Sequence, residues 1–268
     1  MKARWMCGVA LLLVAGMSGA SQIELKPRFW MPELSGHFLT QSSGTDPADF
    51  DFKKDLMIKD GTFPELRLDW RFGRKTKMNL GYMALDYAGD NPSLGKTFTV
   101  NNKPYPANGR LRSSLYSNFY SVGLERCVWN GKRYQVGLVG ELKGFMNRAA
   151  IVYDYVDKGV ARTYRKGMKM PVPIPALGFT LGIKPVKQWT LFANANGITV
   201  PKGALGEGTY AYAFDWDAGA RWCPDKTFSI EGGFRQIRMH AEEMRPPNDN
   251  NITGLNLKGP WVGAGIKF

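Results

Sequence analysis

Apolar and polar residues alternate along most of this chain. In TYAYAFDWDAGARW (209–222), aromatic or small apolar residues occupy every second position, and Asp215, Asp217 and Arg221 fall between them. ELRLDWRF (65–72) repeats the scheme, and so does KGPWVGAGIKF (258–268). A period of two is the pattern of a β-strand with one apolar face. Strands are therefore predicted through the chain to its last residue.

Ten strands are predicted from this alternation. They cover residues 22–32, 62–72, 77–88, 112–128, 133–147, 172–183, 188–199, 208–222, 226–240 and 254–268. The connections FGRKT, NGK, KPVK and PDK are short turns, whereas 33–61, 89–111, 148–171 and 241–253 are long and polar. Short turns on one rim and long loops on the other are typical of an up-and-down antiparallel transmembrane β-barrel. We expect an all-β barrel of about ten strands, with eight or twelve as alternatives.

The two faces of the strands separate a membrane barrel from a soluble sandwich. In a sandwich the apolar face is buried in the core, whereas in a membrane barrel it meets lipid and the charged face lines the lumen. Tyr210 and Trp222 stand at the two ends of the apolar stripe of 209–222. Aromatic residues at both ends match the interfacial girdles of membrane barrels. This pattern favours the membrane interpretation.

The first twenty residues predict a secreted protein. Lys2 and Arg4 precede an apolar stretch that is too short to span a bilayer, and small residues follow near Ala20. We interpret residues 1–20 as a cleaved signal peptide and residues 21–268 as one barrel domain. Later in the chain no run of about 18 apolar residues predicts a membrane helix. Cys127 and Cys223 are too few for a disulfide framework, and we expect free thiols.

The signal peptide, the alternating strands and the closing WVGAGIKF resemble Gram-negative outer-membrane β-barrel proteins. LRLDWRF, LGYMALDYAGD and GPWVGAGIKF are similar to small barrels of environmental proteobacteria that generally lack an assigned function. The resemblance implies an outer-membrane location, with both mature termini in the periplasm. It also implies that the barrel assembly machinery recognises the last strand, in which the candidate signal residues are Trp261, Val262, Ile266 and Phe268.

Parity places a set of charged residues inside the barrel. The candidate lumen network consists of Glu65, Arg67, Asp69, Arg71, Glu141, Lys143, Asp215, Asp217, Arg221, Glu231, Arg235 and Lys267, and parity adds Glu24, Lys26, Arg28 and Glu125. A barrel of this size has an interior that side chains nearly fill, and buried charges are costly unless paired. We therefore expect a salt-bridged, side-chain-filled lumen. A narrow channel for small polar solutes or ions is the alternative, because inward glycines would leave room.

The formal net charge of +13 requires basic residues outside a near-neutral lumen. Lys158, Arg162, Arg165, Lys166 and Lys169 are interleaved with tyrosines in one predicted loop. Such a mixture suits nucleic acid, but the secretory signal argues against that partner. On a bacterial surface the nearest phosphates belong to lipopolysaccharide, which these bases are candidates to bind. A solvated loop is the alternative interpretation.

Candidate catalytic residues are few. Only His37 and His240 could move protons near neutral pH, and His240 has Glu242 on the same strand face. An outer-membrane hydrolase with a rim site near His240 is kept as a further alternative. No His or Cys cluster has metal-ligand spacing, so neither metal nor cofactor is expected. The function expected first is a role in envelope structure or surface contact with lipopolysaccharide, not that of an enzyme or a wide pore. No feature of the sequence indicates an oligomeric state.

Overall fold

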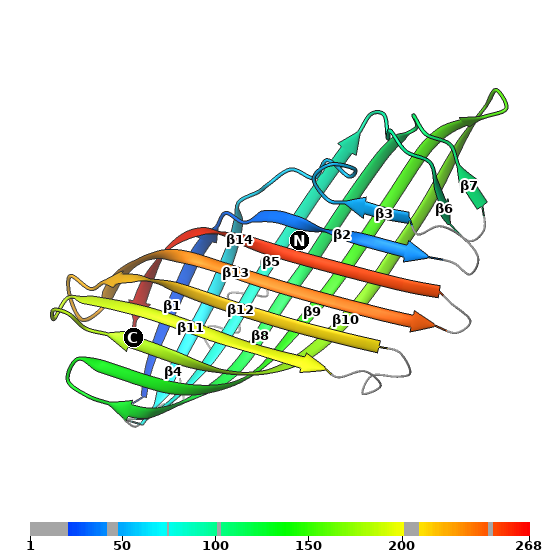
Figure 1. Cartoon of the computed structure of the whole chain (residues 1–268). Helices are drawn as coiled ribbons and strands as arrows, with labels where there is room; N and C mark the ends of the chain where they lie inside the picture. The colour runs from blue at the N-terminus through cyan, green and yellow to red at the C-terminus, as the bar shows by residue number, and fades with distance from the viewer. Residues whose placement is uncertain (1–20, 42–47, 74, 101–102, 201–208, 246–248) are drawn as a thin grey trace.

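The structure is a computed structural model that describes residues 21–41, 48–73, 75–100, 103–200, 209–245 and 249–268. These residues form β-strands and connections (Figure 1). The strands are β1 Ser21–Trp30, β2 Glu33–Gln41, β3 Ala48–Asp51, β4 Phe63–Phe72, β5 Thr76–Asn91, β6 Phe98–Val100, β7 Lys103–Tyr105, β8 Arg110–Asn130, β9 Tyr134–Asp157, β10 Val160–Ile183, β11 Trp189–Val200, β12 Thr209–Trp222, β13 Phe228–Arg245 and β14 Asp249–Lys267. In this part of the chain no helix is long and apolar enough to cross a membrane.

The strands close into an antiparallel barrel of ten strands, which confirms the predicted fold class. The order is β1, β4, β5, β8, β9, β10, β11, β12, β13, β14, and β14 pairs back with β1. We call the end that carries the connections 73–75, 131–133, 184–188 and 223–227 the turn end, and the opposite end the far end. Ser21 and Phe268 both lie at the turn end, where Phe268 donates a backbone hydrogen bond of 2.9 Å to Ile23.

A break at Met31 and Pro32 divides the first barrel strand in two. β14 pairs with β1 toward the turn end and with β2 toward the far end, and β3 folds back on β2. The prediction of a loop over 33–61 was therefore wrong for residues 33–41. Pro32 lacks an N–H donor, so it interrupts a ladder without preventing the chain from resuming it on the same partner.

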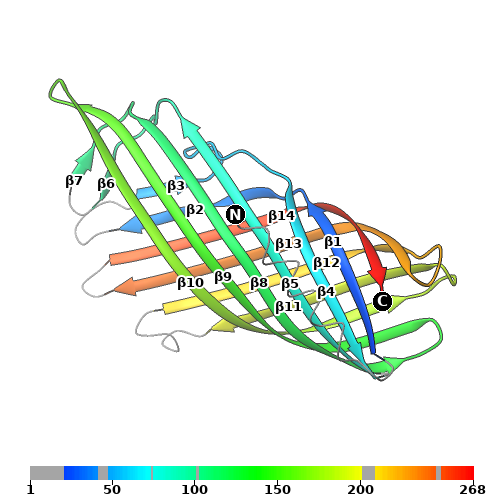
Figure 2. The ribbon, with the colours of Figure 1, turned by 180° about the vertical axis from the view of Figure 1, so that it is seen from behind.

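Three neighbouring strands rise above the rest of the wall at the far end. β8, β9 and β10 are the longest strands, and Figures 1 and 2 show them extending past β11–β14. The predicted loop 148–171 is instead the upper part of the β9–β10 hairpin, which turns on Lys158 and Gly159 with φ of 49° and 79°. A two-residue turn with two positive φ values matches the twist of the strands. The predicted loop 241–253 is likewise mostly strand.

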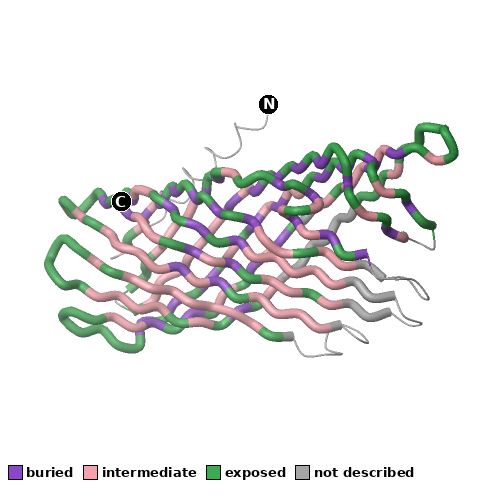
Figure 3. The backbone as a smooth tube through the Cα atoms, turned by 45° about the horizontal axis from the view of Figure 1, so that its top comes forward, coloured by how far each residue is buried: buried purple, intermediate pink, exposed green. Residues whose placement is uncertain are grey.

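The outer surface of the barrel is apolar and the inner surface near the turn end is charged. Residues predicted to face outward, among them Leu66, Trp70, Phe214 and Ile266, are all half-buried or exposed. Figure 3 shows buried positions recurring along the strands while exposed ones gather at the connections. A soluble sandwich would bury the apolar face in its core, so this distribution is that of a barrel surrounded by lipid.

The interior changes character between the two ends. Toward the far end it is filled by an apolar cluster that includes Trp30, Leu34, Met83, Phe119 and Ile237. The β6–β7 hairpin adds a cap of aromatic rings that join β3 to the long β9–β10 hairpin. Its ring contacts are Phe50 to Phe98 at 5.1 Å, Phe98 to Tyr105 at 5.0 Å and Tyr105 to Tyr155 at 5.4 Å. The charged residues occupy the half toward the turn end.

Two inward glycines face each other where β12 and β13 approach closely. Gly219 on β12 is opposite Gly233 on β13. A Cβ on Gly233 would lie 2.3 Å from the carbonyl oxygen of Ala218, closer than any real contact. These glycines therefore allow β12 and β13 to approach closely. They do not widen the lumen, because the neighbouring backbone occupies the space that a side chain would take.

Candidate functional site

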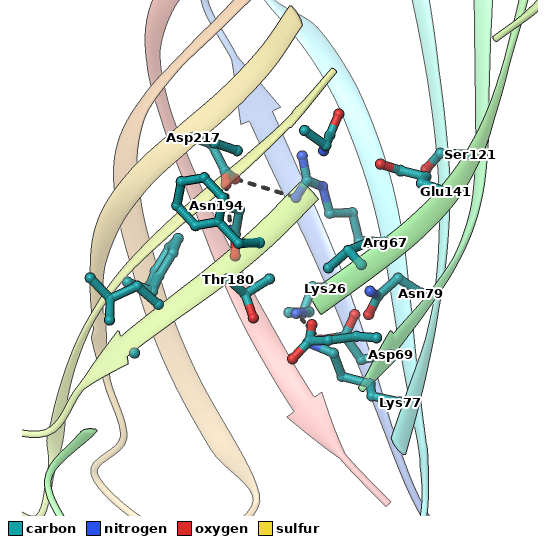
Figure 4. Close-up of a pocket in the computed structure, with 18 of the residues that line it drawn as sticks. Lys26, Arg67, Asp69, Lys77, Asn79, Ser121, Glu141, Thr180, Asn194 and Asp217 are labelled. Atoms are coloured by element: carbon teal, nitrogen blue, oxygen red, sulfur yellow. Dashed lines mark hydrogen bonds and ion pairs between the residues drawn. The ribbon is translucent and has the colours of Figure 1, made fainter. Parts of the chain in front are cut away.

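A polar cavity of about 190 Å³ lies in the charged half of the lumen. Figure 4 shows Asn79, Ser121 and Glu141 on one side of it and Thr180 and Asn194 on the other. The lining residues of β10 and β11 are all uncharged and include Thr180, Asn194 and the inward Phe192, whereas the opposite wall carries the charges. The cavity therefore separates a neutral wall from an ion-pair network.

Most of the charged residues form one continuous series in which acids and bases alternate. Each member contacts the next within salt-bridge distance. The series runs Glu24, Arg221, Glu231, Arg28, Asp217, Arg67, Glu65, Arg235, Asp215, Lys143 and Glu141. It crosses between β1, β4, β9, β12 and β13, so it ties strands that are not neighbours in the sheet. Pairing of this kind is what makes buried charge tolerable.

Two arginines at the centre of the series are almost completely buried. Arg28 contacts Asp217 at 3.2 Å and Glu231 at 2.8 Å. Arg235 contacts Glu65 at 2.7 Å and Asp215 at 2.8 Å. Both guanidinium groups have a side-chain exposure of 3%. Each therefore holds two carboxylates that water does not reach freely.

A second, smaller cluster lies nearer the turn end. Lys26 pairs with Asp69, and Lys77 contacts Glu125 at 2.8 Å and Asp69 at 3.7 Å. Lys77 is a member that our sequence reasoning missed. Its parity with the inward Gly81 on β5 was the available signal, since residues four apart share a strand face.

Aromatic rings close the charged layer from above. The Arg28 guanidinium lies 3.9 Å from the ring centroid of Trp261, and that of Arg235 lies 5.2 Å from Trp30 and 5.6 Å from Phe119. Trp30 and Trp261 face each other across the β1–β14 seam. Cations over desolvated aromatic faces are stabilised by the ring quadrupole. The same arginines thus join the ion-pair network to the apolar cluster.

Two residues assigned to the network lie at the rim of the turn end. Arg71 is exposed at the turn end, lines the cavity and has no carboxylate partner among the described residues. Lys267 is half-buried near the same rim, where it interacts electrostatically with Asp225 of the 223–227 turn and not with the acids of the series. Both residues lie at inward positions of their strands, as predicted. The strands end at this rim, however, where water replaces a partner from the series. Neither residue is joined to the ion-pair series within the described chain, and their place in the network stays a prediction.

The histidines do not form an active site with the lumen acids. His240 faces outward on β13 and its ring stacks on Tyr212, with centroids 5.4 Å apart. Asp215 and Asp217 point into the lumen on the other side of the wall. His37 lies on the same outer row, opposite Gly254, which is in turn opposite His240. Among the described residues no group of three or more His, Cys, Asp or Glu could hold a metal ion.

The basic residues of the β9–β10 tip are divided between two faces. Arg162 and Lys166 share a face of β10 with Tyr164, Arg165 lies on the opposite face, and Lys158 is in the turn. The side chain of Lys169 lies outside the described residues. Arg162 contacts Asp157 at 3.4 Å. The tip therefore does not form one basic surface.

Two outward arginines lie much closer to the apolar band. Arg148 is exposed on β9, two residues beyond the exposed Met146, and Arg238 is exposed on β13 opposite Phe214. Sequence reasoning missed both. The signal in the sequence was a basic residue on the outward face of a strand, two to four residues beyond the last apolar outward residue.

The terminal strand has the sidedness predicted for it. Val262, Ile266 and Phe268 are exposed on the outer face, and Trp261 is buried on the inner face.

Cys127 on β8 and Cys223 after β12 are both free.

No protein-family model matches the chain, and no curated protein sequence matches it. The outer-membrane protease OmpT from Escherichia coli has a similar structure, with a TM-score of 0.59 at 10% identity over 91% of this chain and 97% of that chain. The P. putida toluene transporter TodX has a TM-score of 0.34 at 8% identity, covering 94% of this chain and 91% of that chain. Ail of Yersinia pestis has a TM-score of 0.29 at 12% identity, covering 94% of this chain and 100% of that chain. At these identities the likeness concerns the fold alone, which is that of outer-membrane β-barrels and supports an outer-membrane location.

Proposed function

We propose that this protein is an outer-membrane barrel closed along its axis, with a role in envelope structure or surface contact and not as a wide pore. The observation that carries the proposal is the alternating ion-pair series, which spans the lumen beneath a filled apolar layer. Ions crossing such an interior would have to displace paired charges and then pass an apolar barrier. Both steps are unfavourable.

Planar-bilayer recording tests the axial closure. Purified barrel, with insertion verified by its resistance to protease, is expected to give no steady ion current above the lipid background. Steady unitary currents from the wild type would contradict the proposal. They would favour the alternative of a narrow channel through the polar cavity.

We propose that the turn end faces the periplasm and that Arg148 and Arg238 contact lipopolysaccharide phosphates at the far end. These arginines lie beside the apolar band, whereas the β9–β10 tip lies about ten residues, or roughly 33 Å along the strand, beyond Met146. Arg148→Ala with Arg238→Ala is expected to lower the lipopolysaccharide that co-purifies with the barrel severalfold. The matched control, Lys158→Ala with Arg162→Ala, removes two tip charges and should change it little. If the Lys158 and Arg162 variant lost more lipopolysaccharide than the Arg148 and Arg238 variant, the contact would instead lie at the β9–β10 tip.

We propose no hydrolase site around His240, although OmpT is a protease. The ring of His240 and the carboxylates of Asp215 and Asp217 lie on opposite faces of the wall. A general base must come within hydrogen-bond reach of the group it serves. No peptide or ester hydrolysis above background is expected from the purified barrel.

The barrel assembly machinery is the partner we propose for the terminal strand. Deleting Phe268 removes the exposed aromatic residue that directly follows β14 and is expected to lower the outer-membrane level of the protein several-fold. Barrel that does assemble should unfold at nearly the same urea concentration as the wild type, because few interior contacts are lost. Phe268→Tyr is the control, since it keeps an aromatic ring. A normal level of the deletion variant would refute this role.

A further inference from the structure

The barrel wall is incomplete between β10 and β11. Their ladder runs only from Ile183 opposite Leu191 to Leu177 opposite Gly197. Beyond Leu177, β10 continues to Val160 with β9 as its partner, and β11 continues to Val200 with β12. Figures 1 and 2 show the two strands diverging there. Within the described residues the sheet is thus split from this point to the far end.

Three prolines lie on the free edge of β10. Pro171, Pro173 and Pro175 occur at every second position, and each is within the unbroken ladder to β9. In a strand, backbone N–H groups point alternately to the two neighbouring strands. Because the ladder to β9 is intact, the three proline nitrogens face the β11 side. An edge without these donors cannot accept an added β-strand with regular pairing, so the split is not a docking edge for another chain.

Two cavities adjoin at the split. A small cavity of about 10 Å³ is lined by Phe145, Ile174 and Ala176 on the inside and by Phe214 at the outer surface. It shares Lys143, Asn196 and Asp215 with the polar cavity of about 190 Å³. Apolar side chains at the split therefore border the same charged residues that line the polar cavity.

The split begins at the depth of lipid chains. Leu177 is 78% exposed and Phe214 44%, and both lie on the apolar outer surface. Tyr212, at the aromatic end of β12, is two residues beyond Phe214, about 7 Å along the strand. Unpaired strand edges are tolerated in a membrane only where they line a cavity or meet protein. The split thus opens beside the chains of one leaflet just below the interface.

We infer that the split admits a single-chain amphiphile with a small anionic head, whose head occupies the polar cavity while its chain lies between β10 and β11. The carboxylates that line the cavity are each paired, whereas the Arg71 guanidinium has no carboxylate partner in the described part of the chain. Asn79, Ser121 and Asn194 add neutral hydrogen-bonding groups. Ile174, Ala176 and Phe214 line the small apolar cavity at the split, where the chain would lie. This site is lateral and does not depend on whether the barrel is closed along its axis.

A disulfide across the split tests the passage. In a Cys127→Ser, Cys223→Ser background, Ala176→Cys with Ile198→Cys would join the first unpaired positions. Leu181→Cys with Ala193→Cys joins positions that are already paired and serves as the matched control. The probe is radiolabelled dodecyl phosphate, bound by the protein in lipid nanodiscs after subtraction of empty nanodiscs. Dodecanol is the neutral probe.

Oxidation of the 176–198 pair is expected to lower dodecyl phosphate binding at least tenfold, with recovery on reduction, and oxidation of the control pair should leave it unchanged. Arg71→Ala should weaken dodecyl phosphate several-fold more than dodecanol. If the 176–198 pair does not cross-link, Ala176→Trp, which fills the opening, should lower binding similarly. Binding unaffected by closing the split, or equal for both probes in every variant, would overturn the inference.

Discussion

Replacing Arg235 by alanine is expected to lower the free energy of unfolding by about 3–5 kcal/mol, because it leaves Glu65 and Asp215 buried without their shared partner. The substitution also removes the guanidinium from the faces of Trp30 and Phe119. Urea unfolding of the barrel in lipid vesicles, followed by tryptophan fluorescence, measures the change. The cost should appear as a lower midpoint with a similar slope.

Arg71→Ala is the matched control for Arg235→Ala. It removes the same side chain from an inward position that lines the same cavity, but one with no acidic partner among the residues that the structure describes. Its effect should stay within about 0.5 kcal/mol, as for most exposed sites. If both variants lost the same stability, bulk in the lumen and not charge pairing would account for the cost. If Arg235→Ala cost under 1 kcal/mol, water from the cavity would be solvating the two carboxylates.

Gly233→Ala is expected to cost about 1–3 kcal/mol or to prevent assembly, the range for overpacking a close contact. The new Cβ would lie 2.3 Å from the Ala218 carbonyl oxygen and 2.8 Å from the Gly219 Cα, so β12 and β13 would have to separate. Both nearest groups are backbone and neither can rotate away. The yield of folded barrel and its urea midpoint measure the effect.

The adjacent Gly232→Ala controls for a methyl group added to the same strand. Its Cβ would point outward, 3.6 Å from the Trp261 carbonyl oxygen, which is an ordinary contact. Stability should be unchanged or slightly higher, because alanine loses less backbone freedom than glycine on folding. An equal loss of stability from both substitutions would mean that the close approach of β12 and β13 at Gly219 and Gly233 is not what makes alanine unfavourable at position 233.

Alternation in the sequence was sufficient to predict the barrel, because each strand face meets a uniform environment. It placed Asp215 and Asp217 inside and Phe214 outside, as the structure has them. The same count from the inward Arg235 puts His240 on the outer face, away from Asp215 and Asp217, so a rim site near His240 would have to do without these lumen acids. Loops were overpredicted at 148–171 because Lys and Arg are common there, although Tyr153 and Tyr155 kept the strand period.

Partners across the lumen could not be predicted from alternation. Which acid meets Arg28 or Arg235 depends on strand tilt and register around the whole barrel, and β1 and β13 are over 190 residues apart in the chain. The same holds for the split between β10 and β11. The prolines of β10 were visible in the sequence, but only the pairing of both its edges shows which neighbour they face.

The β1–β14 seam has a consequence for the order in which the barrel can form. Apart from the contacts of β1 and β2 with β14, the barrel strands pair with neighbours close in sequence and can form as successive hairpins. The seam joins the two ends of the domain, so closing it carries the largest cost in loop-closure entropy. This step can occur only after β14 has been synthesised. Arg28 on β1 reaches Asp217 and Glu231 on β12 and β13, near the other side of that seam. Pairs within one strand or between neighbouring strands, such as Arg221 with Glu231, can form before closure. The contacts of Arg28 with Asp217 and Glu231 form only when the seam closes, so they stabilise the completed barrel alone.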